Sequence, residues 1–345
     1  MIMEGTPIMK KFLPVLTVLL LLVIAGCGGE SSDSGNAEET ADEVRIAYFP
    51  NFTHIATIVA LENGYFEEAF GEDVTIDTMT FPNGSAFMEA LSTDEFDIGT
   101  VGPTPATTTY QRNAGHEIIA GAVNGGAVLA TVEDSGIESV EDLDGKRVAV
   151  PTIGSTQDIM LRKELQEVGL NIEDAGGTVS LVPQAPADTS TLFLQGDVDA
   201  AATQEPWGVF LENQANASIL LDEEEFAWGT DLTTTVVTAN NTFTENNPEL
   251  TQDYLRAHLE AIDFIENNNE EAVQIFVDHI EEITGNTLDF DETLEASNRL
   301  NPAYEINEDV IQEMATISME AGYIPSDDVE GLVNREYLDA VLEEE

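Results

Sequence analysis

The chain has 345 residues, of which 42% are hydrophobic, so it can form the cores of two domains of ordinary size. Only 11 lysines and arginines stand against 67 aspartates and glutamates, which gives a formal net charge of −56. So acidic a chain is a poor partner for nucleic acid and for anionic membrane surfaces. The acidic residues occur throughout, without the regular spacing of a calcium loop. We interpret them as the solvated surface of a halophilic acidic protein.

We expect the melting temperature to rise steeply with NaCl, because salt screens the repulsion between carboxylates. Thermal unfolding from dilute buffer to molar salt measures this rise. A midpoint that does not move with salt would contradict the halophilic interpretation.

Residues 1–26 have the pattern of an export signal. A basic start at residues 9–12 is followed by an apolar segment at 13–24 that is too short to predict a membrane span. The paired lysines favour the general secretion route, and translation starts at either Met1 or Met9. The end of this segment resembles a bacterial lipobox. That resemblance implies that Cys27, the only cysteine, becomes the lipid-bearing N-terminus of an extracytoplasmic protein that reaches the membrane through this anchor alone.

Residues 27–43 are almost free of apolar side chains and predict a disordered tether. After it, alternating strand and helix patterns begin. Strands are predicted near 44–48, 74–79, 97–101, 117–123 and 127–131, with helices at 55–62, 85–91 and after Gly102. The sequence Asn124-Gly125-Gly126 separates the last two strands and is a plausible crossover.

The second part of the chain repeats this order. Strands are predicted at 147–150, 179–182, 199–203 and 218–221, and a helix runs to Val168. The chain crosses back around 228–235 and rejoins the first part at 236–239. Five helices are predicted in the tail, at 249–266, 271–284, 291–299, 308–321 and 329–342, and we expect them to pack on the first lobe.

Two stretches of the chain are similar to each other. Residues 45–50 resemble residues 147–152, since each is a predicted strand that ends near a proline. An aspartate follows each at the same distance: Asp97 comes 52 residues after Arg45, and Asp199 comes 52 residues after Arg147. We interpret this as an α/β fold of two similar βαβ lobes whose strand ends face a cleft, where ligands bind. The first lobe would comprise residues 44–130 and 233–345, and the second residues 131–232.

The turn at residues 154–156 is a candidate anion site. Gly154 allows close approach of the backbone, and Ser155 and Thr156 place amides and hydroxyls at a helix start, where the dipole favours negative charge. An ordinary N-cap would explain the same residues. The similar turn in the first part of the chain favours the anion site.

The chain resembles the periplasmic solute-binding proteins of the nitrate, sulfonate and taurine class of ABC importers, most closely the aliphatic-sulfonate branch. The resemblance extends from Val44 to about Tyr323. The stretches that carry it are residues 45–51, 97–105, 145–158, 199–207, 247–250 and 256–261. It implies a type II periplasmic-binding-protein fold with two crossovers, and a non-enzymatic role with an ABC permease and its ATPase as partners. It implies no cofactor and no metal, and we expect a monomer.

The resemblance also implies where a small anionic solute is held. The implied ligand-binding residues, with Asn124 near the crossover added, are Asn51, His54, Gly102, Thr104, Asn124, Gly154, Ser155, Thr156, Gln157, Glu205 and Trp207. Three of these residues could instead serve only the fold. Trp207 could be a core residue, His54 a helix cap, and Glu205 an acceptor at a helix start.

No lysine or arginine lies in a predicted cleft turn. Without a countercharge, a dianion is costly to enclose, so the sequence favours a monoanion such as sulfonate or nitrate. Trp207, Phe52 or Trp228 could cover an apolar tail, which favours sulfonate. The alternatives are nitrate, taurine, a neutral heterocycle, or an enzyme or pyrimidine-precursor-binding relative on the same fold. The expected mechanism is capture by closure of the lobes about hinges near Thr131 and Thr233.

Overall fold

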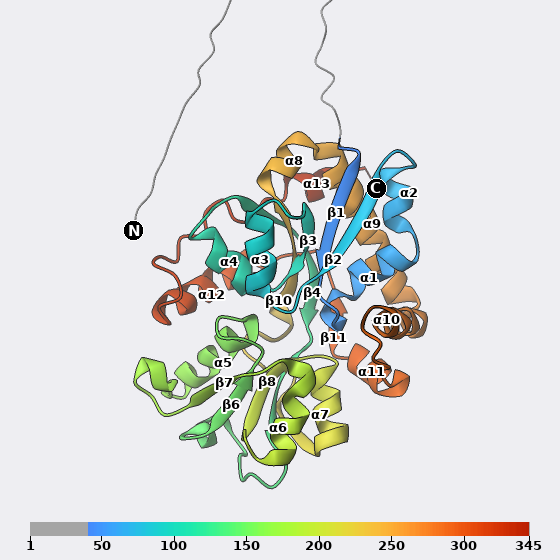
Figure 1. Ribbon diagram of the computed structural model, residues 1–345. Coiled ribbons are helices and arrows are strands. Elements are labelled where there is room, and N and C mark those ends of the chain that lie inside the picture. Colours follow the sequence, from blue (N-terminus) through green and yellow to red (C-terminus); the bar gives the residue numbers. More distant parts are fainter. Residues whose placement is uncertain (1–40, 345) are drawn as a thin grey trace, which may run out of the picture. The chain divides into compact units, whose positions relative to one another are not determined.

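Two mixed β-sheets, each flanked by helices, form the framework of the computed structural model (Figure 1). The structure describes residues 41–344, so the predicted export signal, Cys27 and most of the predicted tether lie outside the described residues. The end of that tether belongs to the folded part, since the Ala41 amide donates to Asn247 Oδ1 (3.0 Å) and the first strand begins at Glu43.

The first sheet has six strands in the order β11-β4-β10-β3-β1-β2. Strand β1 is parallel to β2 and β3, while β10 runs antiparallel to β3 and β4. The short β11 is an antiparallel edge strand on β4. The strands are β1 (Glu43–Tyr48), β2 (Thr75–Thr80), β3 (Ile98–Val101), β4 (His116–Gly125), β10 (Thr233–Asn240) and β11 (Leu300–Pro302).

The second sheet has five strands in the order β7-β6-β8-β5-β9. Its β6 is parallel to β7 and β8, and β5 is antiparallel to β8 and β9. The strands are β5 (Ala127–Val132), β6 (Arg147–Val150), β7 (Ser180–Pro183), β8 (Ala200–Gln204) and β9 (Ala217–Leu221). The first sheet has the same strand arrangement when its edge strand β11 is left out and its order is given in the opposite direction. Strands β2, β1, β3, β10 and β4 then correspond to β7, β6, β8, β5 and β9.

The repeat extends to individual hydrogen bonds. In the first sheet Asp97 accepts from the Arg45 amide (2.9 Å) and from Arg45 Nε (3.0 Å), and Arg45 Nη1 donates to the Asp94 carbonyl (2.7 Å). In the second, Asp199 accepts from the Arg147 amide (2.8 Å), and Arg147 Nη2 donates to the Gly196 carbonyl (2.6 Å). We call these two arrangements the arginine–aspartate clasps. Each ties the first parallel strand of its lobe to the third.

The first crossover lies in the Asn124-Gly125-Gly126 segment that the sequence indicated. Strand β5 pairs within the second sheet, so the chain changes sheet at Gly126. We therefore place the end of the first lobe and the hinge there, rather than at residue 130 and near Thr131. Gly125 and Gly126 have φ of +69° and +70°, a left-handed conformation that glycine adopts without strain. The chain returns before β10, after the short 3-10 helix η5 (Gly229–Asp231).

Helices follow the strands in both lobes. In chain order they are α1 (Ile55–Glu62), α2 (Tyr65–Phe70), α3 (Gly84–Ser92), α4 (Pro103–Tyr110), α5 (Thr156–Glu167), α6 (Thr189–Gln195), α7 (Trp207–Ala215), α8 (Asn241–Asn246), α9 (Pro248–Asn267), α10 (Asn269–Thr284), α11 (Phe290–Ser297), α12 (Glu308–Glu320) and α13 (Glu336–Leu342). Among the described helices none is long and apolar enough to span a membrane.

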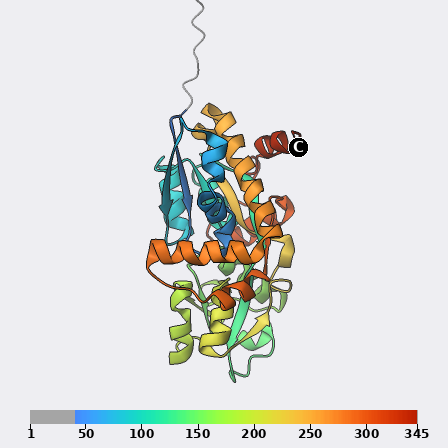
Figure 2. The same cartoon turned by 90° about the vertical axis from the view of Figure 1, so that its right-hand side faces the viewer.

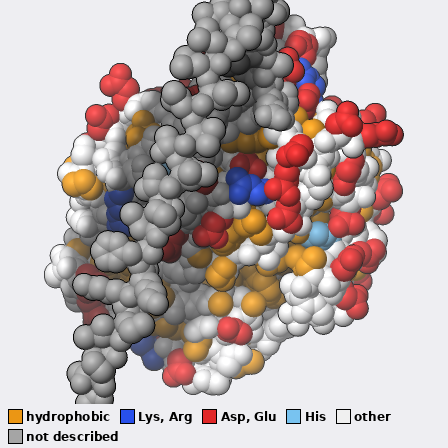
Figure 3. All heavy atoms as spheres, turned by 45° about the horizontal axis from the view of Figure 1, so that its top comes forward, with side chains coloured by type: hydrophobic (Ala, Val, Ile, Leu, Met, Phe, Trp, Pro, Cys, Tyr) orange, Lys and Arg blue, Asp and Glu red, His pale blue; other side chains and the backbone are white. Residues whose placement is uncertain are grey.

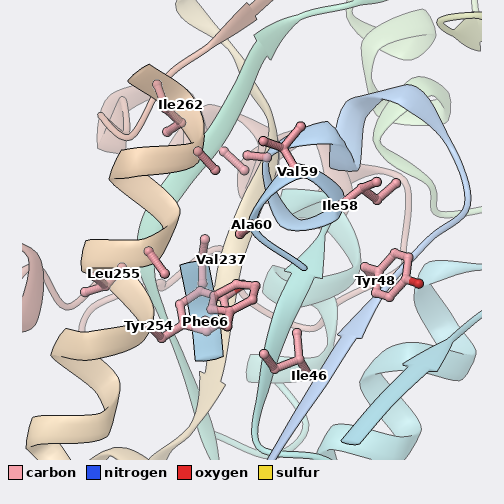
Figure 4. Packing of buried hydrophobic residues seen from close by; sticks show 14 of the residues in the cluster. Ile46, Tyr48, Ile58, Val59, Ala60, Phe66, Val237, Tyr254, Leu255 and Ile262 are labelled. Atoms are coloured by element: carbon pink, nitrogen blue, oxygen red, sulfur yellow. The ribbon is translucent and has the colours of Figure 1, made fainter. Parts of the chain in front are cut away.

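The largest core cluster lies in the first lobe. Tyr254 of α9 is fully buried and stacks on Phe66 of α2, with ring centroids 4.8 Å apart, and Val237 of β10 lies nearby (Figure 4). Helices α9 and α10 pack against α1, and both appear in orange along one side of the first lobe in Figure 2. We therefore assign these two tail helices to the first lobe.

Helix α12 departs from the expectation that the tail helices pack on the first lobe. It packs against α4 of the first lobe and α5 of the second. Its Val310, Met314 and Ile317 join the core cluster of the second sheet, whereas Ile311 belongs to a cluster of the first. Helix α12 is thus shared between the lobes, which the amphipathic pattern of one helix cannot reveal, because the pattern shows an apolar face but not what covers it.

Carboxylates are dispersed over the visible face in Figure 3 and do not gather in one patch. In the described part of the chain, every arginine and lysine except Arg112 and Lys146 is in an ion pair. No group of three acidic, histidine or cysteine side chains among residues 41–344 is placed to hold a metal ion.

Candidate ligand-binding site

A hollow of about 340 Å³ lies between loops at the strand ends of both lobes. The first lobe contributes Phe49, Asn51, Thr53, His54, Pro82, Asn83, Gly84, Gly102, Pro105, Thr234 and Thr235, and the second Pro151, Thr152, Ser155, Thr156, Gln157, Ala185, Pro186 and Gln204. Six of the predicted residues therefore line one hollow. They are Asn51, His54, Gly102, Ser155, Thr156 and Gln157.

On the first lobe, the turn after β1 is held by its own side chains. Asn51 Oδ1 accepts from the amide and the hydroxyl of Thr53, at 3.0 and 2.8 Å. The His54 ring is buried, with Nδ1 2.7 Å from Thr100 Oγ1 and its edge against Phe49. Burial lowers the pKa of His54 to about 3, so its imidazole is neutral at physiological pH.

On the second lobe, the helix start predicted from residues 154–156 is present. Ser155 is the N-cap of α5, and its hydroxyl accepts from the Asp158 amide (3.2 Å). Thr156 is 3% exposed, and its hydroxyl has no hydrogen-bond partner among the described residues. A buried hydroxyl without a partner is costly, so Thr156 is the group here that a ligand could satisfy.

Gly154 plays a different part. Its φ is +80°, and its amide donates to Asp158 Oδ2 (2.8 Å). It lines a neighbouring hollow, not the one with Thr156. Gly154 therefore shapes the turn, while Ser155, Thr156 and Gln157 line the hollow.

The two lobes meet at Gly102 and Thr156. A Cβ atom added to Gly102 would lie 2.5 Å from Thr156 Oγ1, a separation so short that one of the two residues would have to move. The backbone of Gly102 (φ −66°, ψ 146°) is open to any residue, so the approach of Thr156 is what requires glycine here.

Three predicted residues do not line this hollow. Thr104 is fully buried at the start of α4, and its hydroxyl has no partner among residues 41–344. Asn124 lines a separate open hollow with Asp231 and Glu305. Trp207 packs edge-on against Phe210, with ring centroids 5.5 Å apart.

Glu205 also lies outside it, because its oxygens are engaged elsewhere. The side chain is fully buried, Oε1 accepts from Arg299 Nη1 (2.8 Å), and Oε2 accepts from the Val209 amide (3.1 Å). Arg299 also binds Glu212 (2.6 Å). Burial raises the pKa of Glu205 to about 7, although Arg299 acts in the opposite direction. The carboxylate is thus an acceptor at a helix start, and it is also half of a buried ion pair.

Several lining residues were missed from the sequence. Gln204 at the end of β8 has a buried Oε1 with no partner in the described part of the chain, and an amide can turn to present its NH₂ instead. Asn83 caps α3 through the Ala86 amide (3.0 Å). Gln204 is the last residue of its strand and Asn83 comes shortly after the end of β2, and these positions could have identified them. Thr234 and Thr235 lie at the start of β10, just after the chain returns to the first lobe, and no local signal marked them as lining residues.

The hollow has no full charge in its wall. None of its lining residues is Lys, Arg, Asp or Glu, and the only histidine, His54, is neutral. It offers hydroxyls, amides and a strip of proline and phenylalanine. Such a wall suits a solute that needs hydrogen-bond donors and some apolar cover, and it holds no pair of groups arranged for acid–base chemistry.

Two matched lobes joined by two crossovers, with a hollow at facing strand ends, define a type II periplasmic-binding-protein fold, as the family resemblance implied. The sequence matches the NMT1-like family over residues 37–277, and the chain belongs to that family.

The relatives agree with this assignment. The chain is 27% identical over 263 residues to a "Putative aliphatic sulfonates-binding protein" of Escherichia coli K12, covering 74% of this chain and 77% of that protein. It is 27% identical over 207 residues to the taurine-binding periplasmic protein of the same organism, covering 60% and 61%. Its fold matches the alkanesulfonate-binding protein SsuA from Xanthomonas axonopodis pv. citri bound to MOPS, with a TM-score of 0.72, 20% identity and coverage of 86% and 99%. All three are named as binding proteins.

Proposed function

We propose that the chain is the solute-binding component of an ABC importer, and that its solute is a small organic monoanion, most specifically an aliphatic sulfonate. The observation that carries this proposal is the uncharged hollow shared by the two lobes. The partners would be an ABC permease and its ATPase, and Cys27 would anchor the mature protein outside the cell membrane.

The wall of the hollow favours a single, spread charge. A sulfonate distributes one negative charge over three oxygens, which neutral donors such as the Thr156 hydroxyl and the Gln204 amide can share. A dianion enclosed there would lack a countercharge, and that is costly in a water-poor site.

An apolar strip gives room for a short tail. Phe49, Pro82, Pro105, Pro151 and Pro186 line the hollow, whereas Trp207, Phe52 and Trp228, which the sequence suggested for this role, do not. Nitrate would leave this strip uncovered. The ammonium group of taurine would find no carboxylate among the lining residues. An alkanesulfonate uses both the donors and the strip.

Capture by closure follows from the residues on both sides. The ligand would bridge Asn51 and Gly102 of the first lobe and Thr156 and Gln204 of the second, and so favour the closed arrangement that a permease recognises. A micromolar dissociation constant corresponds to about 8 kcal/mol. Several hydrogen bonds and a partly buried tail can supply this amount.

A thermal-shift panel tests the proposal. Mature protein in high salt should be stabilised by alkanesulfonates, by about 2.7 kcal/mol at a ligand concentration 100 times the dissociation constant. At one fixed ligand concentration, the stabilisation should increase with chain length from propanesulfonate to hexanesulfonate. Sulfate and phosphate should give no shift. Equal shifts with sulfate would overturn the charge argument. If only nitrate or taurine shifts the melting temperature, that anion is the ligand instead. If no anion does so, the remaining candidate ligands are a neutral heterocycle and a pyrimidine precursor.

Binding should be independent of pH between about 5 and 8. The pKa of His54 is lowered to about 3 by burial, so no positive charge develops on it in this range to attract an anion. Titration calorimetry at pH 5, 6.5 and 8 in constant NaCl measures the dissociation constant. The stability of the apo protein should instead fall below pH 6.5. Burial lowers the pKa of His54 to about 3 and the pKa values of His116 and His258 to about 4, so the unfolded chain takes up protons that the folded rings do not bind. Tenfold tighter binding at pH 5 would contradict this prediction, because it would mean that His54 becomes protonated and positively charged when the anion is bound.

A further inference from the structure

Tyr323 lies in the tail just after α12 and contacts the helix start of the second lobe from outside the ligand hollow. Its hydroxyl donates to Asp158 Oδ2 (2.6 Å), and Arg162 Nη2 donates to the same hydroxyl. The Arg162 guanidinium carbon lies 4.8 Å from the centre of the Tyr323 ring. Burial and the neighbouring Asp158 raise the pKa of Tyr323, so the hydroxyl keeps its proton and remains a donor.

Asp158 connects this tyrosine to the binding turn. The carboxylate is fully buried, and besides Tyr323 it accepts from the Gly154 amide (2.8 Å) and from Arg162 Nε (2.8 Å). The Asp158 amide in turn donates to Ser155 Oγ. The left-handed turn at Gly154, and the direction of Ser155 and Thr156 that follow it, therefore depend on where this carboxylate is held.

The tyrosine is carried by an element that both lobes share. Helix α12 packs on α4, whose N-cap is Gly102, and on α5, whose first residue is Thr156. Tyr323 itself lines a hollow of about 390 Å³ together with Arg112 of the first lobe and Gly154 of the second. It is thus attached to α5 at the place where the two lobes approach each other.

We propose that Tyr323 is a positioning residue for ligand binding, which acts through Asp158 to hold the turn at residues 154–156 so that Thr156 faces Gly102 and the solute. This inference rests on the proposed function of the hollow. It assigns a role in binding to a side chain that does not line the site.

Tyr323→Phe tests the inference, because it removes two hydrogen bonds and leaves the ring over Arg162. We expect the affinity for hexanesulfonate to fall about tenfold, mainly through faster dissociation in stopped-flow measurements. In the ligand-free protein, the Gly154 and Ser155 amides should exchange hydrogen at least several-fold faster. Tyr110→Phe is the matched control, since its hydroxyl donates to the Glu330 carbonyl (2.8 Å) away from this turn. It should change neither quantity.

Wild-type affinity and wild-type exchange in Tyr323→Phe would overturn the inference. Equal losses in both variants, in proportion to their melting temperatures, would also overturn it, because they would show general destabilisation. If the wild-type protein binds no sulfonate, the proposed ligand fails, but the exchange of the Gly154 amide still decides whether Tyr323 holds the turn.

Discussion

Gly102→Val is expected to abolish ligand binding without unfolding the protein. An added Cβ would lie 2.5 Å from Thr156 Oγ1, so the two lobes could not approach each other as they do around the hollow. The backbone conformation at Gly102 accepts valine, and the clash is relieved when the lobes separate. We therefore expect affinity for the solute to fall at least about 100-fold, a loss of about 2.7 kcal/mol, with little change in the melting temperature of the apo protein.

The matched control is Gly115→Val, in the turn before β4, where an added Cβ meets nothing closer than 3.5 Å. This variant should bind like the wild type. Isothermal titration of both proteins gives the comparison. Unchanged affinity in Gly102→Val would show that Gly102 and Thr156 do not meet around the bound solute, and the closure mechanism would then be wrong.

Arg299→Met should have the largest effect on stability. Arg299 is the partner of Glu205, whose carboxylate is fully buried, and removing one member of a buried pair costs about 3–5 kcal/mol because the other charge is left uncompensated. Denaturant unfolding at pH 8 measures this loss. Arg112→Met is the control, since Arg112 is exposed and lies in no ion pair among the described residues. It should cost little.

Two further measurements assign the loss to Glu205. The double variant Glu205→Gln/Arg299→Met should recover most of the stability, because no buried charge remains. The cost of Arg299→Met alone should also be smaller at pH 5 than at pH 8. The folded-state pKa of Glu205 is raised to about 7 by burial and would rise further without Arg299, so the penalty is removed as the pH falls and the carboxyl takes up a proton. A loss that is equal at both pH values and persists in the double variant would exclude this cause.

Much of the architecture could be predicted because the chain carries the same pattern twice. The spacing of 52 residues between Arg45 and Asp97 and between Arg147 and Asp199 reflects a repeated hydrogen-bonded arrangement, so the sequence signal had a structural cause. Strand ends at Pro50 and Pro151 likewise located turns that line the hollow. Local chemistry at strand ends and helix starts is encoded in neighbouring residues, and it is therefore readable from one sequence.

What could not be predicted depends on distant residues. The residues near Glu205 in the sequence do not indicate that its carboxylate pairs with Arg299, which comes 94 residues later. The turn at residues 124–126 was recognised as a possible crossover, but two apolar strands give no indication of their partners, so the sequence did not reveal that β5 belongs to the second sheet. The lining residues Thr234 and Thr235 are recruited by the return of the chain, and α12 is shared because tertiary packing decides what its apolar face covers.

The arginine–aspartate clasps have a consequence for the cost of capture. Each one fastens the start of the first parallel strand of its own lobe to the start of the third, so it braces the lobe at the ends of these strands that lie away from the hollow. We expect this bracing to keep each lobe rigid when a ligand binds. The lobes can then move as rigid bodies, and little conformational entropy is lost within either lobe when the ligand binds. Uncharged hydrogen-bond donors can therefore be sufficient to bind the solute. Because these contacts are individually weak, the solute can also be released readily to the permease.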